Sequence, residues 1–349
     1  MKKKYLHDDD VLAGLIKLAL TSAHSNATLT TTYGYGCIDN IKDYYPELWR
    51  LIGLISQNLN ASEELKKTHR TTINFILSET RKNSVIEIYR KSKAIKIATY
   101  LQSNGVDILL LKGSALNFSV YKDSANRYTS DIDILVKKRD YQKTIELLGK
   151  EYTRCGTDQH LFTELFQTTF VDVDQNIDVI IDLHSSLTYP TLFNINEGDI
   201  WKRSICLDKD IKAMSWEHQL ILISISAFRN MDYMNYYLVD FHEMYCNKIE
   251  SSLELEKIVD QTGTRIPFDF YVSFYENWLG STYSKGRKNI FSILINYLVR
   301  KKEGKNNLVT QILQAIVLYS STKNKAGVLK FHLACLSLFL NSFLKRMNK

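Results

Sequence analysis

The spacing of apolar residues divides the chain into a helical beginning, a mixed middle and a helical end. From residue 8 to about residue 104, apolar side chains recur at helical intervals, which predicts helices with one buried face. Between residues 107 and 184, short apolar runs alternate with helical stretches, a texture typical of a mixed α/β core. Helical spacing returns at Ser215 and continues to the end. We therefore expect an N-terminal helical region at 1–104, a core at 105–210 and a C-terminal helical domain at 211–349.

Three segments of the middle unit have the patterns expected of strands. Residues 108–111 form a short, wholly apolar run, as in a buried strand. In the segment 131–136, alternate residues point the same way, so Asp131 and Asp133 share one face while the residues between them face a core. The segment 178–184 has the same alternation. The sequence thus predicts a small mixed sheet with helices packed on it.

Composition and cysteine usage are those of an ordinary globular protein in a reducing compartment. Of the 349 residues, 45% are hydrophobic and 24% charged, which is typical of soluble domains. The 5 cysteines show no CxxC spacing, which argues against a zinc site or a disulfide framework. No apolar signal-peptide stretch follows the basic start at the right distance. We expect a cytoplasmic protein without an integral membrane span.

Positive charge is concentrated at the end of the chain. The net charge is +7, yet residues 300–349 carry ten Lys or Arg and a single acid, Glu303, so the rest is close to neutral. This basic segment is either a solvated helical face or a contact for an acidic, phosphate-rich partner. The apolar stretch 328–344 is too short and mixed for a membrane span, which leaves a core helix or an interfacial membrane contact.

The most informative chemistry lies in the paired carboxylates of the segment 131–136. Asp131 and Asp133 repel each other unless a cation lies between them, and hard oxygen ligands of this kind suit Mg²⁺. A third carboxylate, Asp182, stands between two apolar residues on another predicted strand, where it needs a partner. It would complete the metal site, and it is also placed to orient or deprotonate an acceptor hydroxyl. We expect His184 to be a hydrogen-bonded neighbour and not a metal ligand.

Residues before the carboxylates are suited to hold phosphate. Gly113 permits close approach of a phosphate, and Ser114 offers either a hydroxyl ligand or a helix cap. Lys112 is expected either to contact phosphate or to extend from the strand end into solvent. Arg127 either clamps a triphosphate with its guanidinium or pairs with Asp131 or Asp133.

These motifs resemble a known superfamily. Leu111-Lys112-Gly113-Ser114, Arg127, Ser130-Asp131-Ile132-Asp133 and Ile181-Asp182-Leu183-His184 are similar to motifs of polymerase-β-type nucleotidyltransferases, and more narrowly of a bacterial family of uncharacterised nucleotidyltransferases. The resemblance covers residues 107–187 well and the downstream helices loosely. It implies an α+β fold, with a polymerase-β-like nucleotidyltransferase core flanked by N-terminal and C-terminal helical regions. One departure is the gap of eighteen positions from Gly113 to Asp131, which is longer than in the broad superfamily and fits the narrower family.

The resemblance further implies the activity and the role of each residue. It implies transfer of a nucleoside monophosphate from an NTP, with ATP expected, to an acceptor hydroxyl by an in-line mechanism with two Mg²⁺ ions. Asp131, Asp133 and Asp182 would be the catalytic and metal-binding residues, and Lys112, Gly113, Ser114 and Arg127 would bind the nucleotide. The motif leaves open whether the acceptor is a small molecule, a protein or an RNA such as tRNA. The alternatives are an inactive nucleotide-binding or scaffold protein with the same fold, and a nucleic-acid-binding protein with incidental carboxylates.

Overall fold

The computed structural model describes most residues between Trp49 and Leu279. The described positions are 49–60, 63–121, 123, 126–155, 166–174, 177–188, 192–208, 211–229, 237–249, 252–279, 326 and 329. The helices expected before residue 49 and at 328–344, and the basic segment 300–349, lie outside these positions except for Ala326 and Leu329.

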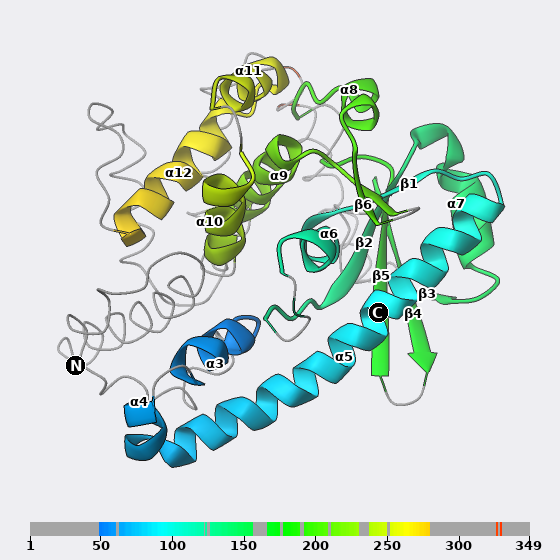
Figure 1. Ribbon diagram of the computed structural model, residues 1–349. Coiled ribbons are helices and arrows are strands. Elements are labelled where there is room, and N and C mark those ends of the chain that lie inside the picture. Colours follow the sequence, from blue (N-terminus) through cyan, green and yellow to red (C-terminus); the bar gives the residue numbers. More distant parts are fainter. Residues whose placement is uncertain are drawn as a thin grey trace, which may run out of the picture.

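A mixed sheet of seven strands forms the centre of the described part (Figure 1). In chain order the strands are β1 (Ile108–Leu110), β2 (Asp131–Val136), β3 (Thr153–Arg154), β4 (Gln167–Asp174), β5 (Ile177–His184), β6 (Ile205–Asp208) and β7 (Ile211–Ala213). Their order across the sheet is β3-β4-β5-β2-β1-β7-β6. Strand β2 is parallel to β5 on one side and antiparallel to β1 on the other. It therefore occupies the middle of the sheet, where both of its edges are hydrogen-bonded.

The helices fall into three groups along the chain. Before the sheet come α3 (Ile52–Asn60), α4 (Glu63–Thr68) and α5 (Arg70–Ser103). Between the strands lie α6 (Lys112–Ser119), the short 3-10 helix η2 (Lys138–Asp140), α7 (Tyr141–Leu148) and α8 (Glu197–Lys202). After the last strand come α9 (Trp216–Arg229), α10 (Leu238–Asn247), α11 (Ser252–Thr262) and α12 (Arg265–Leu279).

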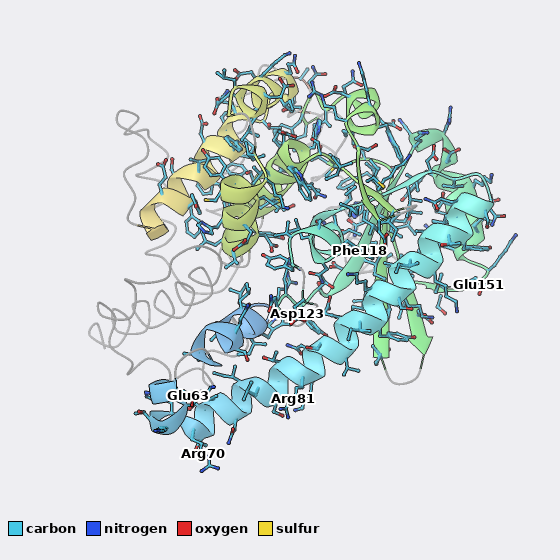
Figure 2. All side chains as sticks on the ribbon, in the orientation of Figure 1. Glu63, Arg70, Arg81, Phe118, Asp123 and Glu151 are labelled. Atoms are coloured by element: carbon cyan, nitrogen blue, oxygen red, sulfur yellow. The ribbon has the colours of Figure 1, made fainter. Side chains whose placement is uncertain are left out.

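Helix α5 extends from the helices α3 and α4 to the sheet. Its 34 residues correspond to about 50 Å of helix. Arg70 and Arg81 project from its first half, which extends beyond the sheet toward α3 and α4 (Figure 2). Its last turns pack on the sheet through Ile97 and other apolar residues. The helix ends at Ser103 before Gly105, whose φ of 72° is one that glycine adopts without strain, as the sequence predicts.

Side-chain alternation gives the two faces of the sheet different roles. On one face, Ile132, Ile181 and Leu183 pack in the same cluster as Ile97 of α5. On the other face, Leu135 packs in a cluster with Met214 and Leu222, the latter from α9. Asp131 and Asp133 share the face of Leu135, because residues two apart in a strand point the same way. The acids therefore lie on the side of the sheet toward α9.

Helices from both ends of the described chain share one hydrophobic core. A single cluster contains Ile55 of α3, Ile76 of α5, Phe228 of α9, Phe241 of α10 and Tyr271 of α12. Each of these side chains is almost completely buried. Helices that precede and follow the sheet in sequence thus form one helical body beside it (Figure 1).

The fold class predicted from the sequence is confirmed. A mixed sheet with helical flanks is present, and β1, β2 and β5 lie where the sequence pattern places them. The hairpin of β6 and β7 was not expected, because strands of four and three residues are too short to establish a period. Through β7, which pairs with β1, the sheet continues to Ala213. Among the described helices, none combines the length and apolarity needed to cross a membrane.

Candidate active site

Strand register brings the predicted carboxylates together. Strands β2 and β5 are parallel, and Asp133 is paired directly with Asp182 across them. Asp131 lies one pleat earlier on β2, opposite Ile180. Thr169, on the next strand, donates a hydrogen bond from Oγ1 to Asp182 Oδ1 at 2.6 Å. Two acids adjacent in the sheet, with a third on the same face, form the centre of the site.

The ligand atoms that converge most closely belong to Asp133, Asp182 and His184. One oxygen or nitrogen from each lies within 4.8 Å of the others, close enough to hold a metal ion. Asp131 is not part of this group, and its Oδ1 accepts a hydrogen bond from Ser130 Oγ at 2.9 Å. Carboxylate oxygens are the ligands that Mg²⁺ prefers, so the donor set fits a hard divalent cation.

His184 lies beside Asp133, as a neighbour of the carboxylates. Its Nε2 is 2.9 Å from Asp133 Oδ1, and both side chains are buried. With Nε2 protonated, the ring donates to the carboxylate and fixes its orientation. This contact agrees with the hydrogen-bonded role expected from the sequence.

Lys112 enters the site from the first residue of α6. Its Nζ forms an ion pair of 2.8 Å with Asp133 Oδ1. Its backbone has a φ of 46°, the left-handed region that a side chain with a Cβ adopts at a cost of about 1 to 3 kcal/mol. The backbone N–H of Lys112 donates to Oε1 of Gln219, a residue of α9, at 2.9 Å. The site therefore contains a lysine with a strained backbone, and a residue of the helical body accepts its N–H.

Burial and neighbouring charges shift the pKa values of Asp131 and Asp133 in opposite directions. Burial raises the pKa of Asp131 to about 6, helped by the negative charge of Asp133 and only partly opposed by Lys112. Burial also opposes ionisation of Asp133, but Lys112 and the hydrogen bond from His184 outweigh it and hold the pKa of Asp133 well below its ordinary value. The charges of Asp133 and Asp131 likewise outweigh burial at Lys112 and raise its pKa. Asp133 is thus a fixed anion, and Asp131 is the carboxylate that is costly to ionise without a cation.

Gly113 and Ser114 have structural tasks that the sequence did not reveal. A Cβ on Gly113 would lie 2.4 Å from Arg127 Nη1 and 2.6 Å from Thr129 Cγ2, so only glycine fits beneath these side chains. Ser114 Oγ donates to the carbonyl of Asp131 and accepts from the N–H of Asp133, both at 3.1 Å. This hydroxyl fastens α6 to β2 instead of capping its own helix. Both residues hold the carboxylate strand against the start of α6.

Arg127 is paired with Asp240 of α10, and not with Asp131 or Asp133. Its Nε and Nη2 donate to the two oxygens of Asp240 at 2.6 Å each. Tyr121 donates its hydroxyl to the same carboxylate at 2.8 Å. All three side chains are buried, and the attraction of Asp240 outweighs burial and raises the pKa of Arg127. Pairing with Asp131 or Asp133, one of the two roles that the sequence left open, is therefore wrong, because a buried acid 113 positions away neutralises the guanidinium.

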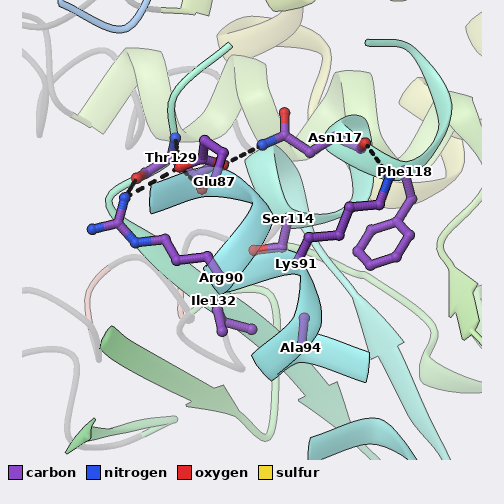
Figure 3. A pocket seen from close by; sticks show the side chains of 9 residues that line it. All are labelled: Glu87, Arg90, Lys91, Ala94, Ser114, Asn117, Phe118, Thr129 and Ile132. Carbon is purple, nitrogen blue, oxygen red and sulfur yellow. Dashed lines mark hydrogen bonds and ion pairs between the residues drawn. The ribbon is translucent and has the colours of Figure 1, made fainter. Parts of the chain in front are cut away.

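A second buried acid, Glu87 of α5, organises the segment that leads into β2 (Figure 3). Glu87 Oε1 accepts the N–H of Thr129 at 2.9 Å, and Oε2 accepts the Thr129 hydroxyl at 2.8 Å. Asn117 of α6 donates to Oε2 at 2.6 Å, and Arg90 bonds both Glu87 and the carbonyl of Thr129. The cavity that these side chains line has a volume of about 10 Å³, the size of one water molecule. It is a packed polar connection, too small to bind a nucleotide.

Replacing Glu87 with alanine is expected to destabilise the fold by about 3 kcal/mol, because several buried donors lose their acceptor. Urea unfolding measures the change. Glu63→Ala is the matched control, since Glu63 is an exposed acid paired with Lys66 on the surface and should contribute less than about 1 kcal/mol. Equal effects of the two substitutions would contradict the structural role of Glu87.

Three positioning residues lie far from the motifs in sequence. Glu87 precedes the sheet, and Gln219 and Asp240 follow it, yet all three bond to residues between Lys112 and Thr129. Glu87 and Asp240 are both buried, but their neighbours at helical spacing include polar residues such as Asn83, Arg90 and Glu243. The sequence therefore gives no apolar helix face that would mark these acids as buried.

The strands, the acids and the lysine at the start of α6 define a class of protein. A mixed sheet that presents acids on adjacent strands, beside a Lys-Gly-Ser helix start, is the architecture of the polymerase-β-type nucleotidyltransferases. Comparison with protein families agrees: residues 49–280 match the model of a family described as uncharacterised nucleotidyltransferases, and the chain belongs to this family. A comparison with curated proteins gives no match to the chain. The family and the buried Asp-Asp-His group both fit a nucleotidyltransferase activity.

Proposed function

We propose that this protein transfers a nucleoside monophosphate from an NTP, with ATP as the expected donor, to a hydroxyl group of an acceptor. The acceptor oxygen attacks the α-phosphorus, and the bond from that phosphorus to the α,β-bridging oxygen breaks. Pyrophosphate leaves, and the hydroxyl proton passes to a carboxylate of the site. The catalysis required is chiefly in-line positioning and neutralisation of charge.

The observation that carries this proposal is the register of β2 and β5. Asp133 and Asp182 are paired in neighbouring parallel strands, and Asp131 lies on the same face one pleat away. Three acids so close together are unfavourable without a cation, as the raised pKa of Asp131 indicates. In a nucleotidyltransferase family, we expect these acids to bind Mg²⁺, the cation that carboxylates hold together with nucleotide phosphates.

Each carboxylate has a different task in the proposed reaction. Two Mg²⁺ ions held by Asp131, Asp133 and Asp182 would neutralise the phosphates and lower the pKa of the acceptor hydroxyl. Asp133, which Lys112 and His184 hold as an anion in the metal-free protein, would supply a ligand oxygen. Asp182 orients the acceptor and takes its proton, while Thr169 holds one of its oxygens in place.

The start of α6 is the proposed phosphate site. The backbone N–H groups of Gly113 and Ser114 lie in the first turn of the helix, where a helix places unpaired donors for an anion. Lys112 adds a positive charge there. Arg127 is engaged by Asp240, so we assign it to holding the segment before β2 and not to clamping phosphate.

Labelled nucleotide transfer tests the function. The purified protein, incubated with each α-³²P-labelled NTP, Mg²⁺ and a cytoplasmic extract, should move label onto one class of acceptor among protein, RNA and small molecules. The control is the Asp131→Asn/Asp133→Asn double variant, which should transfer nothing. Mg²⁺-dependent NTP binding without transfer would favour a nucleotide-binding scaffold protein. The absence of both NTP binding and label transfer would contradict the proposal.

A further inference from the structure

Lys112 has a backbone conformation that its own side chain disfavours. Among the described residues it is the sole non-glycine with a positive φ, although a glycine follows it immediately. Strained conformations of this kind persist where the surroundings hold them, and they cluster at functional sites. The chain places a lysine, and not the neighbouring glycine, at the position that needs left-handed backbone.

The surroundings that hold Lys112 come from the helical body. Gln219 of α9 is 0% exposed, and its Oε1 accepts the Lys112 N–H at 2.9 Å. The Nε2 of Gln219 is buried and has no hydrogen-bond partner within the described part of the chain. A buried amide that leaves a donor unsatisfied costs stability, so its presence is better explained by the conformation that it gives Lys112.

The side chain of Lys112 bonds a carboxylate of the candidate metal site. Asp133 Oδ1 accepts Lys112 Nζ at 2.8 Å and faces His184 Nε2 at 2.9 Å. Asp133 is 2% exposed and belongs to the group whose ligand atoms converge within 4.8 Å. An ammonium group and a divalent cation at one carboxylate repel each other, so they compete for Asp133.

We propose that Lys112, held by Gln219, is a resident counter-cation of the carboxylates, which leaves Asp133 when a divalent cation binds and then contacts the phosphates of the nucleotide. This inference rests on the proposed nucleotidyltransferase function. It assigns Gln219 a positioning role, since the amide keeps the lysine backbone at the boundary between the two sites. The same side chain thus opposes metal binding to the free protein and favours triphosphate binding afterwards.

Opposite changes in two affinities are the expected signature. Lys112→Met, which keeps the length of the side chain and removes its charge, should tighten Mn²⁺ binding to the nucleotide-free protein about tenfold. It should weaken binding of a non-hydrolysable ATP analogue about tenfold. Gln219→Leu should change both affinities in the same directions by smaller factors. Mn²⁺ binding is followed by electron paramagnetic resonance of the free ion, and analogue binding by calorimetry.

Lys93→Met is the matched control. Lys93 forms a half-buried ion pair of 2.5 Å with Asp172 of β4, which is paired with Val179, three residues before Asp182 on β5. The substitution removes the same charge from helix α5, away from the site, and it should leave both affinities unchanged. Thermal melts of all variants identify any that fail to fold.

The outcomes separate this inference from the proposed function. Tighter Mn²⁺ binding together with weaker analogue binding in folded Lys112→Met supports the exchange. Unchanged or weaker Mn²⁺ binding in that variant would overturn it while leaving the metal site intact. If the wild type binds Mn²⁺ no better than the Asp131→Asn/Asp133→Asn variant, the metal site itself is wrong and the proposed function fails.

Discussion

Asp131→Asn is expected to abolish nucleotidyl transfer, by about a thousandfold or more, and at the same time to stabilise the metal-free protein. The pKa of Asp131 is raised to about 6 in the folded protein, above its value in the unfolded chain. An acid with a raised pKa makes the folded protein less stable as the pH rises from the unfolded pKa through the folded pKa, because the folded state disfavours the ionised form. Asparagine keeps the hydrogen bond from Ser130 and removes the charge. We expect a gain of about 1 to 3 kcal/mol at pH 7.5 in EDTA.

Asp133→Asn should be equally inactive but less stable than the wild type. The pKa of Asp133 is depressed, so its ionised form stabilises the fold above its unfolded pKa near 4, and this is lost only at strongly acid pH. Asparagine leaves the partly buried Lys112 without the counter-charge of Asp133, at a cost of about 1 to 3 kcal/mol. Urea unfolding in EDTA, beside the labelled transfer assay, measures both properties. Equal destabilisation by the two substitutions would contradict the assigned electrostatics.

Breaking the Arg127–Asp240 pair should cost about 3 to 5 kcal/mol, the largest stability effect that we expect from a single residue. Arg127→Met leaves Asp240 buried with Tyr121 as its one remaining donor among the described residues, and Asp240→Leu leaves a buried guanidinium. The double variant should cost clearly less than the sum of the single changes, because neither charge then remains unpaired. Urea unfolding of the four proteins gives the coupling energy.

Activity in the same series tests what the pair positions. Arg127 packs over Gly113, so both single variants should loosen the start of α6 and lower transfer about tenfold or more at a temperature where they remain folded. Arg265→Met is the control, since Arg265 pairs with the more exposed Glu256 and Asp260 and should affect stability by less than about 1 kcal/mol. Additive single costs would show that Arg127 and Asp240 do not act as a pair.

The sequence predicts the carboxylate strands well because their information is local. Alternation of acidic and apolar residues specifies both a strand and the face on which Asp131 and Asp133 lie. The position of Asp182 between two apolar residues of a predicted strand similarly indicates a polar partner. These features depend on a period of two residues, which is readable without knowledge of the fold.

Partners distant in sequence could not be predicted for the opposite reason. Arg127 offers a guanidinium to any buried acid, and periodicity does not distinguish Asp240 from Asp131 or Asp133. Likewise, the side chains that pack over Gly113 require glycine there, a reason that the motif, which suggested only phosphate, could not reveal. Such choices are made by tertiary packing.

The shared core of α3, α5, α9, α10 and α12 makes the sheet, topologically, an insertion into a helical host. During synthesis, α3 to α5 of the helical host emerge first, the sheet follows, and α9 to α12 emerge last. Until α9 to α12 emerge, Ile55 and Ile76 lack the apolar partners that bury them in the complete cluster. Over the same interval, Lys112 lacks its hydrogen bond to Gln219, and Arg127 lacks its ion pair with Asp240. Closure of the host and assembly of the catalytic face are therefore one event, and a truncated chain that ends before α9 should acquire neither.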